Sequence, residues 1–71
     1  MNIIIADADD WCGLYVDGKL VMEDHDITAS DVCPLIVGHT LEAYIHKEVD
    51  FDWLSDIGNF PETIEEVKWA T

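Results

Sequence analysis

The chain has 71 residues, and its 16 Asp and Glu residues face only 3 Lys and no Arg, which gives a formal net charge of -13. This excess of acid excludes direct nucleic-acid binding and binding to anionic membranes, because contacts to phosphate groups are made mainly by Lys and Arg. Hydrophobic residues make up 49% of the chain, which is too many for a disordered protein. We therefore expect one compact acidic domain over residues 1–71.

The β-branched run within residues 1–6 predicts a first strand that is buried on both faces. Acidic residues follow this run at once, which argues against a signal peptide or a membrane-spanning segment and favours a cytoplasmic protein. Cys12 and Cys33 lack CxxC spacing. They would form one disulfide in a secreted protein, but in cytoplasm we expect them to be reduced and buried.

The next signal is a β-hairpin formed by residues 12–16 and 19–24. Asp17-Gly18 is a two-residue turn of the type that favours a left-handed backbone. This turn predicts Leu14 opposite Val21 and leaves apolar residues on both faces of the hairpin. A sheet of this kind needs a helix on one face and a second helix or a partner subunit on the other.

Thr28 and Asp31 resemble a capping box, which marks the beginning of a helix. Because an interior proline is unfavourable, Pro34 favours a later start at Ser30 or Asp31, which would place the proline in the first turn. We expect this helix to end at Gly38.

Alternation from Thr40 to Val49 predicts another strand with one core face. Residues 52–56 predict a single helical turn that ends before Gly58, and Asn59 is expected to cap a last helix. The predicted fold is therefore α+β, a small antiparallel sheet in the order β-β-β-α-β-α with one or two short helices packed on one face.

The sequence contains no recognisable catalytic or metal-binding motif. An EF-hand loop beginning at Asp7 would have Trp11 at its fifth position, where an acidic or amide side chain is needed. The three histidines lack ligand spacing, neither cysteine has a basic neighbour that would activate it, and no glycine-rich phosphate loop is present. We therefore predict that the protein is not an enzyme and uses no metal or other cofactor.

The clustered acidic residues are the main candidate for function. Solubility alone needs a smaller net charge, of magnitude roughly 2 to 8. Carboxylates at alternate strand positions recur about every 6.6 Å, a spacing comparable to that of backbone phosphates, and Trp11 is a candidate aromatic anchor among them. The predicted partner-binding residues are Asp7, Asp9, Asp10, Trp11, Asp24, Asp26, Asp50 and Asp52.

The segment Gly13–Val21, followed by Trp53-Leu54 and Phe60-Pro61-Glu62, resembles short uncharacterised proteins from tailed-bacteriophage genomes. In size, acidity and lack of catalytic motifs the chain is similar to phage-encoded inhibitors of host defence, including anti-CRISPR proteins and DNA mimics. This resemblance implies a stoichiometric inhibitor in the cytoplasm of the host bacterium. Its implied partner is a basic nucleic-acid-binding host protein such as a CRISPR-Cas effector.

Two other hypotheses remain open. In one, the chain is a homodimeric structural or regulatory module: the second apolar face of its sheet forms the subunit interface, and the acids serve only to keep the protein soluble. In the other, the chain is a small metal-binding protein.

Overall fold

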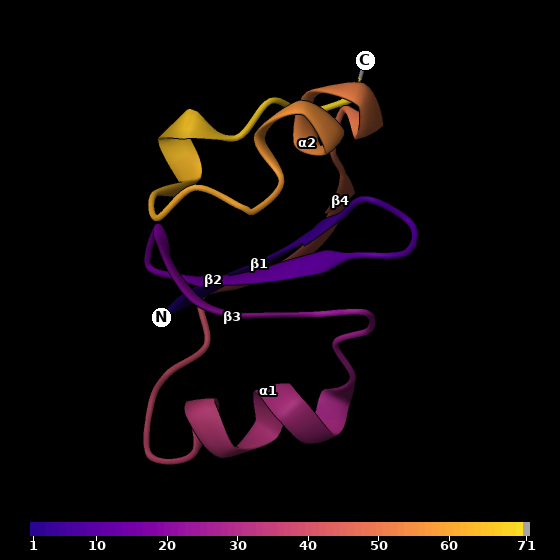
Figure 1. The fold of residues 1–71 in the computed structure, drawn as a ribbon. Helices are drawn as coiled ribbons and strands as arrows, with labels where there is room; N and C mark the ends of the chain where they lie inside the picture. The colour runs from indigo at the N-terminus through magenta and orange to yellow at the C-terminus, as the bar shows by residue number, and fades with distance from the viewer. Residues whose placement is uncertain (71) are drawn as a thin grey trace.

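A computed structural model describes residues 1–70. It confirms the α+β class and the predicted order β-β-β-α-β-α (Figure 1). The elements are β1 (Asn2–Asp7), β2 (Cys12–Val16), β3 (Lys19–Asp24), α1 (Ala29–Ile36), β4 (Ala43–Glu48), α2 (Phe51–Ile57) and the 3-10 turn η1 (Ile64–Glu66). Within the described residues, no helix has both the length and the apolar character needed to cross a membrane.

The four strands form one mixed sheet in the order β3-β2-β1-β4. β2 pairs antiparallel with β1 and β3, but β4 lies parallel to β1, with Tyr44 beside Ile3. The prediction of a purely antiparallel sheet is therefore wrong for β4. The physical reason is the connection, because a chain that crosses a sheet face through a helix returns in its original direction.

The two helices lie on opposite faces of the sheet (Figure 1). The predicted packing of the helices on one face is therefore wrong, whereas the expectation of a second helix on the other apolar face, one of two alternatives, is confirmed. Ile3 and Leu14 pack towards α1, whereas Ala6 and Tyr15 pack towards α2 and the C-terminal segment. A helix packs on only one face of a sheet, so the two apolar faces are covered by separate elements. The chain thus covers the sheet face that the homodimer hypothesis had assigned to a second subunit.

The hairpin forms at Asp17-Gly18 as predicted, and both turn residues have positive φ. A β-bulge then changes the register, so that Leu14 pairs with Met22 rather than with Val21. The extra residue turns Met22 onto the face that packs on α1 and leaves Val21 50% exposed.

Helix α1 begins at Ala29, one or two residues earlier than the start predicted from Pro34. Its N-cap is Thr28, whose backbone N–H donates to the Asp31 carboxylate at 2.8 Å, as in the capping box. Pro34 therefore lies inside the helix. Because proline has no backbone N–H, the carbonyl of Ser30, four residues earlier, lacks its helical donor. Ser30 is exposed, so water is available to this carbonyl instead.

The C-terminal third forms α2 and an irregular segment that packs across the same sheet face. The Asp50 side chain caps α2 by accepting from the Trp53 N–H at 3.1 Å. The predicted last helix capped by Asn59 does not form. Instead, the Phe60 N–H donates to the Glu23 carboxylate at 2.7 Å, which ties this part of the chain to β3 and leaves only the short turn η1.

The contact between Gly13 and Phe60 gives a direct test of this packing. A Cβ atom at Gly13 would lie 2.8 Å from two atoms of the Phe60 ring. Gly13→Ala should therefore lower the free energy of unfolding by about 1 to 3 kcal/mol, the usual cost of overpacking, measured by urea denaturation. In a Phe60→Leu background the penalty should shrink; an equal penalty in both backgrounds would contradict this contact.

Candidate functional site: the acidic end of the sheet

The topology gathers acidic segments at one end of the sheet. β1, β3 and β4 run in the same direction, so their C-terminal ends meet, and α2 begins directly after β4. The register places Asp7 between Glu48 and Cys12, which in turn pairs with Asp24. We call this surface the acidic end; it comprises Asp7, Asp9, Asp10, Asp24, Asp26, Glu48, Asp50 and Asp52.

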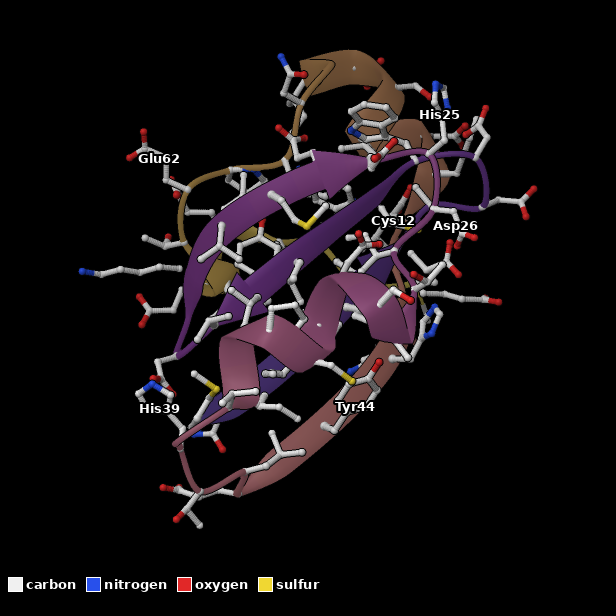
Figure 2. The ribbon with its side chains drawn as sticks, turned by 90° about the horizontal axis from the view of Figure 1, so that it is seen from below. Cys12, His25, Asp26, His39, Tyr44 and Glu62 are labelled. Atoms are coloured by element: carbon white, nitrogen blue, oxygen red, sulfur yellow. The ribbon has the colours of Figure 1, made fainter. Side chains whose placement is uncertain are left out.

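Seven of the eight residues predicted for partner binding belong to the acidic end. The eighth, Trp11, lies beside it, since it follows Asp10 directly and packs against His25. Figure 2 shows His25 and Asp26 near Cys12 at this end, whereas His39 lies at the opposite end of the molecule. The sequence had identified three separate acidic stretches, and the fold brings them together.

Phe51 lies at the centre of the acidic end, and the sequence analysis missed it. It lines an open depression of about 280 Å³ together with Asp7, Asp9 and Glu48. It also lines a second depression together with Asp10. The Phe51 side chain is 53% exposed. Trp11 was singled out because it is an aromatic residue next to Asp9 and Asp10, and Phe51 is likewise an aromatic residue next to Asp50 and Asp52, so the same sequence signal could have identified it.

Trp11 is held by the fold more firmly than we expected of an exposed anchor. Its indole Nε1 donates to the Glu23 carboxylate at 3.1 Å, and its ring meets that of His25 edge to face at 5.0 Å. It is partly buried against the core cluster on the α2 side of the sheet. The aromatic group at this end that is most available to a partner is therefore Phe51.

Three of the predicted carboxylates have partners within the chain. Asp24 accepts from the N–H of its neighbour His25 at 2.7 Å. Asp7 and Asp50 each contact a basic side chain as well as a backbone N–H. Asp7 is hydrogen-bonded to His46 Nε2 at 2.8 Å and accepts from the Asp9 N–H at 2.7 Å. Asp50 caps α2 and lies 3.7 Å from Lys68 Nζ. The carboxylates of Asp7 and Asp50 therefore stabilise the local structure of the acidic end through contacts within the chain. The more exposed ones are Asp9, Asp10, Asp24, Asp26 and Asp52.

The two pairs expected at alternate strand positions, Asp24 with Asp26 and Asp50 with Asp52, do not have that spacing. Asp24 ends β3 and Asp26 lies beyond it, while Asp50 is the N-cap of α2 and Asp52 lies within that helix. Neither pair sits on alternate positions of one strand. The density of negative charge arises instead from separate segments that converge in space.

Metal binding and nucleophilic chemistry each require particular arrangements of histidine, cysteine and carboxylate side chains. Within residues 1–70, no group of three or more His, Cys, Asp or Glu side chains is arranged to hold a metal ion. Both cysteines are free; Cys12 is buried as predicted, but Cys33 is exposed on α1, where the prediction of burial is wrong. Burial and the neighbouring Asp7 carboxylate raise the pKa of Cys12 to about 11, so its thiol is a poor nucleophile at neutral pH.

The chain matches no protein family, no curated protein sequence and no solved structure.

The Asp7–His46 contact predicts a measurable shift. Burial raises the pKa of Asp7, but the hydrogen bonds from His46, the Asp9 N–H and Cys12 outweigh it, so that the pKa lies below the usual 3.8. Because the folded pKa is depressed, the carboxylate contributes stability above about pH 4 that is lost as the pH falls through the folded pKa. His46→Ala should raise the Asp7 pKa in a carbon-13 NMR titration.

The control is His39→Ala, which removes an exposed histidine at the other end of the molecule. It should leave the Asp7 titration unchanged. An Asp7 pKa that does not respond to His46→Ala would show that this pair does not order the end of β1.

Proposed function

We propose that this protein is a phage-encoded acidic inhibitor that imitates DNA and blocks the nucleic-acid-binding channel of a host defence protein, such as a CRISPR-Cas effector. The observation that carries the proposal is the convergence of three acidic chain segments at the C-terminal ends of β1, β3 and β4. The phage origin and the class of target draw their support from the small size, the net charge of -13 and the resemblance to host-defence inhibitors.

A surface of this kind suits a cationic channel for electrostatic reasons. Exposed carboxylates such as Asp10 and Asp26 lie in the loops that adjoin the strand ends, and each of them meets a Lys or Arg of the channel as a phosphate would. Concentrated charge of one sign accelerates association and makes the affinity depend strongly on salt. Phe51 adds an exposed aromatic contact within the charged surface, and aromatic groups of this kind frequently dominate binding energy.

The proposal is tested first by finding the partner. The tagged protein is incubated with bacterial extract at about 50 mM and then about 500 mM salt, and the retained proteins are identified by mass spectrometry. We expect one basic nucleic-acid-binding protein that is lost at high salt. Recovery of the protein alone, or of partners that are insensitive to salt, would contradict the proposal.

Matched charge reversals then locate the surface. Asp10→Lys with Asp26→Lys, and Glu62→Lys with Glu65→Lys, each change the net charge from -13 to -9, because each of two substitutions adds two charges. All four side chains are exposed and form no hydrogen bond within residues 1–70. The first pair should weaken binding to the captured partner by at least about tenfold, whereas the second should change it less than about threefold.

Circular dichroism should show that both double variants keep the fold. Equal losses in the two variants would mean that only net charge matters and that the acidic end is not the binding surface.

A further inference from the structure

The outer edge of β4 is open over most of its length. The C-terminal segment covers only its last part, where the Ala70 N–H donates to the Glu48 carbonyl at 3.0 Å and the Asp50 N–H donates to the Lys68 carbonyl at 2.9 Å. Backbone groups of successive strand residues point to opposite sides. Since the Val49 N–H donates towards β1, those of Tyr44 and His46 face outwards, and nothing within residues 1–70 pairs with them.

This open edge carries apolar side chains on both faces. Tyr44 is 48% exposed on the side of α1 (Figure 2), and Ile45 is 46% exposed on the opposite side. Ile45 also borders an open trough of about 360 Å³ that is lined further by Ile4 and Ile64. An added strand would therefore gain both backbone hydrogen bonds and apolar contacts on each face.

The edge lacks the protection that exposed edge strands usually carry. Natural proteins guard such edges with bulges, prolines or a lysine that projects over the free backbone groups. β4 contains Lys47, but its Nζ lies 5.1 Å from the centre of the Trp69 ring, where it makes a cation–π contact with the C-terminal segment. The stretch Tyr44–His46 is left open.

Two occupants of the free β4 edge can be compared by their charge: a second copy of this chain and a basic segment of another protein. A second copy paired about a two-fold axis at Ile45 would place Glu42 of one chain opposite Glu48 of the other, and every register would join two chains of charge -13. An extended segment rich in Lys would instead complement the carboxylates of Glu48 and Asp7 where the strand reaches the acidic end.

We propose that β4 binds an extended basic segment of the partner protein by strand addition, next to the acidic end. This inference rests on the proposed function and deepens it, since it gives the same partner a second, backbone-mediated contact. The strand fixes the orientation of the complex, while the carboxylates supply the charge.

The probe is a short synthetic peptide in which valine alternates with lysine and threonine, titrated into the isotopically labelled protein. We expect shifts of the Tyr44 and His46 amide signals and slower hydrogen exchange there. A control peptide that is N-methylated at alternate residues keeps the charge and the side chains, but along one of its two edges it has no backbone N–H to donate to β4. It should bind at least about tenfold more weakly, because two or more hydrogen bonds are lost. Equal binding of both peptides would overturn strand addition.

A matched pair of variants separates this inference from the proposed function. Ile45→Lys guards the edge, whereas Val21→Lys makes the same change at a similarly exposed site on β3. Only Ile45→Lys should weaken binding of the peptide, and of the captured partner, by about tenfold.

If neither lysine variant weakens binding while Asp10→Lys with Asp26→Lys does, the strand contact is wrong and the acidic surface stands. Sedimentation that shows a concentration-dependent dimer, abolished by Ile45→Lys, would assign the edge to a second copy and overturn the proposal.

Discussion

Strand β1 must be covered on both faces, and the rest of the structure depends on this requirement. Ile3 and Ile5 on one side and Ala6 on the other are all at most 1% exposed. The strand is therefore placed in the interior of the sheet, between β2 and β4, with a helix on each face. The route that delivers α1 to one face also returns β4 parallel to β1, and so the acidic ends of the strands coincide.

The acidic end is costly for stability, because like charges are crowded on a small domain. The fold offsets this repulsion with two apolar clusters and a few partly buried hydrogen bonds. The Tyr15 hydroxyl donates to the Pro61 carbonyl at 2.6 Å, and its ring meets Phe60 edge to face. Burial, with nearby carboxylates, raises the pKa of Tyr15, so the hydroxyl remains a donor at any ordinary pH. Glu23 binds both Trp11 and the Phe60 N–H from the same carboxylate.

The sequence predicted those features that are set locally. Asp17-Gly18 predicted the hairpin turn correctly. The capping residues Thr28 and Asp31 predicted the start of α1 correctly, whereas the later start inferred from Pro34 was wrong. The bulge that moves Met22 to the other face could not be foreseen, because alternation alone favours an unbroken register.

The sequence pattern also could not predict that β4 is parallel to β1, because the direction of a strand depends on how the preceding chain crosses the sheet. The same limit applies to the site. The acidic stretches were visible one by one, but their meeting depends on the shared direction of three strands. Phe51 could have been predicted, because it is an aromatic residue adjacent to two aspartates, as Trp11 is adjacent to Asp10.

The central claim is that the protein occupies the place of DNA on its partner. The most direct measurement is a titration of the chain into a complex of the captured partner with labelled DNA, followed by fluorescence anisotropy at several salt concentrations. The account predicts stoichiometric release of DNA, with affinities for chain and DNA that fall in parallel as salt rises. A stable complex containing partner, DNA and chain together would contradict it.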